Sequence, residues 1–303
     1  MVNERIIVTI ADSNYFPSVA ISAMQASKFH PESAFIVYDW GLKSFEKVFL
    51  RNHGARIVDW QSRFVELPIP SFSIPKRIRS IVKSDARTRS KLKLARDTIV
   101  DGITNKRRNR EWLYAQKPYV LAHCSEHSPD GTILFLDGDA FLVNSIEEFF
   151  SEPSELKVTI RRKEEISFAF GYCRVINAGV IGIAGSENTR RKIISEWIKK
   201  MQELVDDCVE QTALTRLIYG KSCVAVPEEI RRVKMRQGSF KAKILECDTY
   251  NYNWIEEGVN PDKNKIVHFK GGRHNEENFF RLSMAVGLSE EVEVIKDLRR
   301  SEP

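Results

Sequence analysis

The stretch TILFLDGDAFLVNS, residues 132–145, carries the strongest structural signal in the chain. Its apolar run from Ile133 to Leu136 predicts a buried strand that leads directly into Asp137-Gly138-Asp139. Two carboxylates that lie two residues apart on extended chain point to the same side, and glycine between them permits a close approach. Burying both charges costs several kcal/mol unless a cation compensates them. The motif therefore predicts a site for Mg²⁺ or Mn²⁺, which prefer oxygen ligands.

Two other interpretations of this motif stay open. Asp-Gly pairs are common in exposed turns, where the acids are incidental. Phosphatases with an aspartyl-phosphate intermediate also place D-x-D after a strand, with the first Asp as the nucleophile. Such enzymes usually have the motif near the N-terminus and a small or hydroxylated residue two positions after the second Asp. Here that position holds Phe141 and the motif begins at residue 137, so a metal site is the favoured interpretation.

Short apolar runs alternate with helical patterns along the chain, which is typical of an α/β fold with a doubly wound, mostly parallel sheet. In such sheets ligands bind at the carboxyl ends of the strands, so the loop after Ile10 is a candidate site on topology alone. We expect strands over 6–11, 34–38, 55–58, 132–136, 175–183 and 266–269. We expect helices over 19–29, 45–52, 112–123, 189–204 and 208–219.

The positive charge of the chain is concentrated in one segment. The 303 residues have a net charge of +6, yet residues 75–110 contain thirteen Lys and Arg against three Asp, a local charge of +10. No aromatic residue lies in this segment, which argues against single-stranded nucleic acid because stacking needs aromatic side chains. An anionic membrane surface or an acidic glycolipid or polysaccharide acceptor fits better. A solvated basic helix with no partner is the remaining alternative.

The remaining composition is that of an ordinary globular protein. It excludes wholesale disorder, collagen-like repeats and coiled-coil fibres. The five cysteines are scattered and lack metal-binding spacing, so we expect free thiols in a reducing compartment. The first residues contain no long apolar segment and no run of 18 apolar residues occurs. We therefore expect a cytoplasmic protein, soluble or peripherally attached to the inner face of the membrane.

Four further segments, together with LFLDGD, resemble motifs of one enzyme family in the family's order. They are VTIADSNYFPSVAIS from Val8, VINAGVIGI from Val175, EQTALTRL from Glu210 and IVHFKGGRH from Ile266. The chain thus resembles the family 8 glycosyltransferases and related nucleotide-diphospho-sugar transferases, which include glycogenin and bacterial lipooligosaccharide galactosyltransferases. The resemblance implies a GT-A fold, which is a single Rossmann-like domain. We expect this domain over 1–275, with a basic helical insertion at about 75–110 and a C-terminal helical extension over 276–303.

The resemblance also implies roles for particular residues. Asp137, Asp139 and His268 would bind Mn²⁺ or Mg²⁺, although His268 lies 129 residues beyond Asp139. Glu210 and Gln211 would face the transferred sugar, with Glu standing where the family has Asp. Uridine contacts would come from Ala11, Asp12 and Asn14, with Tyr15 stacking on the base, and Asn177, Ala178 and Gly179 would lie beside the donor sugar. Lys117 matches a basic family residue near the donor. In place of the family's phosphate-binding Lys, we expect Lys270 or Arg273, with the backbone amides of Gly271 and its neighbour, to bind the diphosphate. The family's usual Lys-Pro-Trp is absent, since His274 stands at the Lys position.

The activity implied is metal-dependent transfer of a hexose from a UDP-sugar to an acceptor hydroxyl, with retention of anomeric configuration. Glycolipid or polysaccharide assembly is the expected context.

Overall fold

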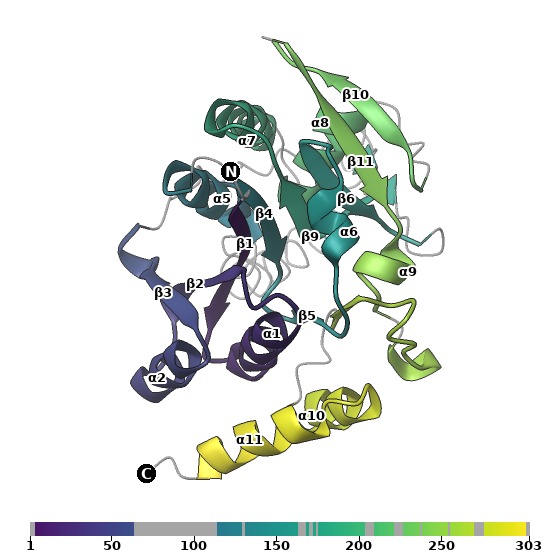
Figure 1. The fold of residues 1–303 in the computed structure, drawn as a ribbon. Coiled ribbons are helices and arrows are strands. Elements are labelled where there is room, and N and C mark those ends of the chain that lie inside the picture. Colours follow the sequence, from purple (N-terminus) through teal and green to yellow (C-terminus); the bar gives the residue numbers. More distant parts are fainter. Residues whose placement is uncertain are drawn as a thin grey trace, which may run out of the picture.

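Eight strands form the central sheet of the computed structural model (Figure 1). The structure describes residues 4–63, 114–128, 131–162, 168–169, 172–173, 175–203, 209–220, 227–236, 238–253, 255–269 and 276–300. The basic segment 75–110 and the three residues Lys270, Gly271 and Arg273 lie outside the described residues.

The sheet has the order β10-β11-β6-β9-β4-β1-β2-β3. Its strands are β1 (Glu4–Asp12), β2 (Ala34–Gly41), β3 (Ala55–Asp59), β4 (Gly131–Leu136), β6 (Leu156–Ile160), β9 (Ile176–Ile183), β10 (Ile230–Lys234) and β11 (Ser239–Leu245). Strands β3, β2, β1 and β4 are mutually parallel, as the alternating pattern predicts. Strand β9 runs antiparallel to both β4 and β6, and β10 runs antiparallel to β11. The reversal of β9 brings its first residues to the carboxyl end of β4.

Helices cover both faces of the sheet, as Figure 1 shows. Helices α1 (Phe16–Phe29), α2 (Ser44–Asn52), α6 (Glu147–Ser151), α10 (Glu276–Ala285) and α11 (Ser289–Arg300) share one hydrophobic core. Helices α5 (Lys117–Glu126), α7 (Glu187–Gln202) and α8 (Val209–Tyr219) share the other. Strand β1 serves both cores because its side chains alternate, with Ile7 facing one and Val8 the other. None of the described helices combines the length and hydropathy needed to cross a membrane.

Smaller elements complete the fold. A two-stranded sheet pairs β5 (Ala140–Leu142) with β12 (Ile266–His268), and another pairs β7 (Phe168–Ala169) with β8 (Tyr172–Cys173). Helix α9 (Cys247–Tyr250) and two 3-10 turns, Gln61–Arg63 and Ile255–Glu257, lie in connections. The β5–β12 pair joins the segment after Asp139 to the segment that carries His268.

Strand β6 contains a buried cation, Lys157, whose amino group has no hydrogen-bond partner among the described residues. The ammonium lies 5.5 Å from the ring centroid of Phe149. Burial lowers the pKa of Lys157 from 10.5 to about 8, and the charge of Glu152 opposes this shift only in part. The folded chain therefore holds this proton much less tightly than the unfolded chain does.

Replacing Lys157 with methionine is expected to stabilise the fold near neutral pH, by up to about 3 kcal/mol. The unfolded chain keeps the proton up to about pH 10.5, whereas the folded chain loses it near pH 8, so wild-type stability rises across this interval. The advantage of Lys157→Met should shrink over the same interval. Chemical denaturation of both proteins at several pH values measures the difference, and equal unfolding free energies at pH 7 would contradict the account.

Candidate metal and donor site

Asp137, Asp139 and His268 meet at the carboxyl end of β4. Asp137 directly follows β4, Asp139 precedes β5, and His268 ends β12, where it pairs with Ala140 of β5. His268 Nε2 lies 3.1 Å from Asp139 Oδ1 and 3.7 Å from Asp137 Oδ2, and one ligand atom from each residue falls within 4.8 Å of the others. Two carboxylate oxygens and an imidazole nitrogen are a donor set that suits Mn²⁺ or Mg²⁺. The residues present therefore fit a divalent cation.

Two glycines allow this approach of side chains. A Cβ on Gly179 would stand 2.4 Å from His268 Cε1 and 2.6 Å from its Nδ1, so only glycine leaves room for the ring. A Cβ on Gly138 would stand 3.1 Å from Cγ of Tyr15. The backbone fixes the same region, because the Asp137 amide donates to the Gly179 carbonyl at 2.8 Å and the Phe269 amide donates to the Asp139 carbonyl at 2.8 Å. Both glycines thus serve close packing around the acids.

Lys117 is a buried cation directly beside the acids. Its ammonium lies 2.7 Å from Asp137 Oδ1 and 3.9 Å from Glu210 Oε1, and it donates to the Ala178 carbonyl at 3.1 Å. Burial opposes its charge, but the two carboxylates outweigh burial and raise the pKa of Lys117. Lys117 therefore stays charged and holds one oxygen of Asp137, while the other oxygen faces His268.

Glu210 and Gln211, at the start of α8, lie next to Lys117 and to β9. Burial raises the pKa of Glu210, and Lys117 acts against that rise. Gln211 Oε1 accepts from Arg161 Nη2 at 2.8 Å. Sequence reasoning missed Arg161, because it follows β6, a strand whose pattern is interrupted by the inward-facing Lys157.

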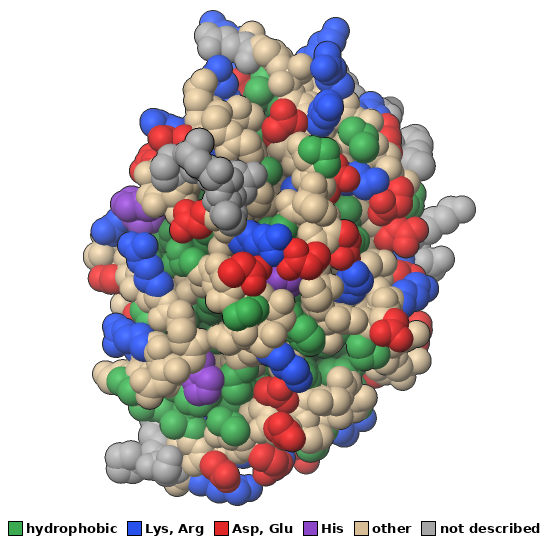
Figure 2. Space-filling view, viewed as in Figure 1, with side chains coloured by type: hydrophobic (Ala, Val, Ile, Leu, Met, Phe, Trp, Pro, Cys, Tyr) green, Lys and Arg blue, Asp and Glu red, His purple; other side chains and the backbone are tan. Residues whose placement is uncertain are grey.

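Several buried polar atoms here have no hydrogen-bond partner among the described residues: Glu210 Oε1, Asn177 Nδ2 and Arg161 Nε. Leaving a buried polar atom unsatisfied costs about 1–3 kcal/mol. A ligand that hydrogen-bonds these atoms would remove that cost. In Figure 2, acidic, basic and histidine side chains gather near the centre of the face, at the level between β4 and β5 of Figure 1.

The loop after β1 contributes the remaining predicted residues. Asp12 accepts from the Asn14 amide at 2.9 Å and from Asn14 Nδ2 at 3.2 Å, so these side chains shape the turn. The residue before α1 is Tyr15, which has no side-chain capping bond, so Asp12 is not an ordinary helix cap. Burial, followed by the charge of Asp139, raises the pKa of Tyr15. Tyr15 therefore lies close to the predicted metal ligands, while Ala11 is buried at the end of β1.

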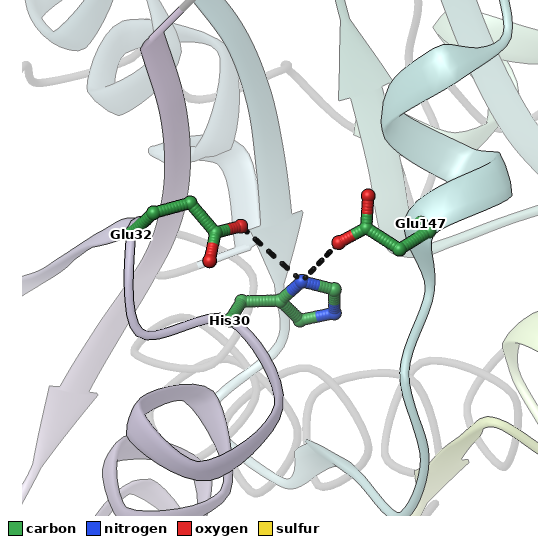
Figure 3. A group of neighbouring side chains, drawn as sticks. All are labelled: His30, Glu32 and Glu147. Atoms are coloured by element: carbon green, nitrogen blue, oxygen red, sulfur yellow. Dashed lines mark ion pairs between the residues drawn. The ribbon is translucent and has the colours of Figure 1, made fainter.

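A second cluster of His30, Glu32 and Glu147 also brings potential ligands together (Figure 3). Here, however, Arg5 Nη1 already lies 2.7 Å from an oxygen of each glutamate. His30 Nε2 accepts from the Ile146 amide at 3.1 Å, so the neutral ring carries its proton on Nδ1, toward the carboxylates. Burial lowers the pKa of His30, which favours this neutral ring. The cluster therefore ties β1 to α6 and does not present a lone pair to a metal.

Comparison with solved structures relates this architecture to known enzymes. The WbbM bifunctional glycosyltransferase superposes with a TM-score of 0.53 at 10% identity, over 97% of this chain and 52% of that one. The chain shares the fold of this glycosyltransferase. The galactosyltransferase LgtC, solved with donor and acceptor sugar analogues, superposes with a TM-score of 0.46 at 17% identity, over 93% of this chain and 95% of LgtC. GlyE of Streptococcus pneumoniae TIGR4 superposes with a TM-score of 0.47 at 13% identity, over 97% of this chain and 63% of GlyE.

Sequence-level comparisons add no relative to these. No family model matches the chain, and no curated protein matches its sequence. The shared fold agrees with the GT-A architecture that the resemblance implies.

Proposed function

We propose that the chain is a metal-dependent glycosyltransferase that moves a hexose from a UDP-sugar to an acceptor hydroxyl. The observation that carries this proposal is the meeting of Asp137, Asp139 and His268 at the carboxyl end of β4, beside unsatisfied buried polar atoms. An acidic and imidazole donor set that is flanked by Lys117, Arg161 and Asn177 suits a cation together with an anionic, hydroxyl-rich donor.

Asp137, Asp139 and His268 hold the cation in this proposal. When bound, Mn²⁺ or Mg²⁺ acts as a Lewis acid that offsets the charge developing on the departing diphosphate. Lys117 keeps Asp137 in place and compensates part of the acidic charge of the site. These groups are held by β4, β5, β12 and α5, so they are positioned before the donor binds.

Separate residues take the two ends of the donor. The sugar is bound by residues of β9 and of the start of α8, which lie on one side of Asp137 and Asp139: Asn177, Ala178, Gly179, Glu210 and Gln211. Ala11, Asp12, Asn14 and Tyr15 take the uridine at the end of β1. Lys270 and Arg273 bind the diphosphate. The basic residues within 75–110 bind a glycolipid or polysaccharide acceptor. In this proposal the protein works in the cytoplasm, at the inner face of the membrane, and retains the anomeric configuration.

A screen of UDP-, GDP- and CMP-sugars for hydrolysis, with and without Mn²⁺, tests the proposal. We expect turnover of UDP-sugars only, dependent on the metal and abolished by chelation. Full activity after chelation would overturn the metal-dependent mechanism. Absence of turnover with every nucleotide sugar, supplied with glycan acceptors, would overturn the transferase assignment.

A further inference from the structure

A continuous chain of buried hydrogen bonds runs from β9 to His268. Thr159 Oγ1 donates to the Asn177 carbonyl at 3.0 Å, and Asn251 Nδ2 donates to Thr159 Oγ1 at 2.6 Å. Asn251 Oδ1 lies 2.7 Å from His268 Nδ1. Thr159 and Asn251 are fully buried, so water does not compete for these bonds.

The donor and acceptor of each of these hydrogen bonds follow from the Asn177 carbonyl at one end of the series. The Asn177 carbonyl can only accept, so the Thr159 hydroxyl donates its single hydrogen to it. Thr159 Oγ1 must then accept from Asn251, which points the amide nitrogen at Thr159 and the amide oxygen at His268. An oxygen facing His268 Nδ1 requires a proton on Nδ1. In the neutral ring, Nε2 is therefore left with a lone pair, and it faces Asp139 and Asp137.

We propose that Asn251 and Thr159 are positioning residues that fix His268 in the Nδ1-protonated tautomer, with Nε2 directed at the two aspartates. Outer partners of this kind orient metal-binding histidines and set their tautomer. The consequence for metal affinity rests on the proposed function, whereas the tautomer itself does not. Neither residue belongs to a motif that the sequence alone singled out.

The hydrogen bonds that link Asn177 through Thr159 and Asn251 to His268, called the relay below, also fix part of β9. The pairing of β6 with β9 shifts at Thr159: Val158 pairs with Ile181, but Thr159 pairs with Asn177. Residues 178–180 are thereby left out of the β6 pairing, and Gly179 within them packs against the His268 ring. Thr159 thus joins the irregular part of β9 to the asparagine that holds His268. Loss of its hydroxyl should loosen the ring and the strand together.

Four variants separate this role from a general loss of stability. Asn251→Leu keeps the branching and the number of side-chain heavy atoms and removes the acceptor for Nδ1–H. Thr159→Val removes the hydroxyl that orients the amide, and Thr159→Ser restores it. Asn264→Leu is the matched control, because Asn264 is also buried but donates to the Asp248 carbonyl, outside the relay.

The first readout is the tautomer of the neutral His268 ring, from long-range proton–nitrogen NMR of the metal-free protein at about pH 9. His268→Gln identifies the signal. Wild type, Thr159→Ser and Asn264→Leu should show the proton on Nδ1. Asn251→Leu and Thr159→Val should shift the population toward the Nε2-protonated form. A wild-type ring with its proton on Nε2, or an unchanged tautomer in Asn251→Leu, would overturn the proposal.

The second readout is Mn²⁺ affinity by calorimetry. Asn251→Leu should weaken binding about 10- to 100-fold, Thr159→Val should weaken it less, and Thr159→Ser and Asn264→Leu should match wild type. Wild-type affinity in Asn251→Leu would overturn the positioning role while leaving the proposed function standing. The predicted tautomer in a wild-type protein that binds no Mn²⁺ would support the relay and overturn the proposed function.

Discussion

Asp139→Ala is expected to abolish metal-dependent turnover of the nucleotide sugar. Asp139 is one of the three proposed ligands, and its Oδ1 lies 3.1 Å from His268 Nε2, so its loss removes the oxygen nearest to the imidazole. The metal supplies several kcal/mol of charge stabilisation, so the rate should fall by about 10²- to 10³-fold or more. Initial rates at saturating Mn²⁺ measure the effect.

The fold should survive this change. Removing a buried carboxylate relieves repulsion between Asp139 and Asp137, so circular dichroism and the thermal midpoint should remain close to wild type or rise. Asp297→Ala is the control, since Asp297 is an exposed acid on α11 that pairs with Arg300 one helical turn away. Unchanged transfer by Asp139→Ala would rule out the metal site as drawn.

Gly179→Ala is expected to be as damaging as loss of a ligand, although it adds only a methyl group. The new Cβ would stand 2.4 Å from His268 Cε1, which is closer than Cβ contacts allow, so the ring must move. A displacement of about 1 Å at a reacting centre can cost about 10²-fold in rate. We expect Mn²⁺ affinity and turnover to fall together, measured by calorimetry and by initial rates.

Gly182→Ala provides a matched comparison in the same strand. Its Cβ would stand 2.6 Å from Phe149 Cζ, so the clash is similar but lies in the hydrophobic core, away from the acids. This variant should lose stability while keeping wild-type Mn²⁺ affinity per folded molecule. If Gly179→Ala lost only stability and kept its metal affinity, the close packing of glycine against His268 would have no functional meaning.

The sequence predicts best those strands whose residues form an uninterrupted apolar run. The apolar runs ending at Ile10 and Leu136 predict β1 and β4 because both strands are buried on both faces. Strands β6, β10 and β11 were not predicted from the sequence. Lys157 faces inward from β6, and the β10–β11 hairpin is rich in Lys and Arg, so neither shows a plain apolar pattern.

For the site, the sequence predicts the residue types and the structure shows which of them meet. The Asp137-Gly138-Asp139 motif and the His268 segment were singled out, and the structure brings them together through the β5–β12 pair. The ion pair between Lys117 and Asp137, the bond from Arg161 to Gln211 and the Thr159–Asn251 relay were not predicted. These contacts join residues from different strands and helices, and spacing along one chain carries no information about them.

Titration of the purified chain with Mn²⁺, followed by electron paramagnetic resonance with and without UDP, tests the central claim most directly. It needs neither the correct sugar nor the acceptor. The account predicts saturable Mn²⁺ binding that UDP tightens and that Asp139→Ala abolishes. Mn²⁺ binding that is indifferent to UDP, or equal in wild type and Asp139→Ala, would contradict it.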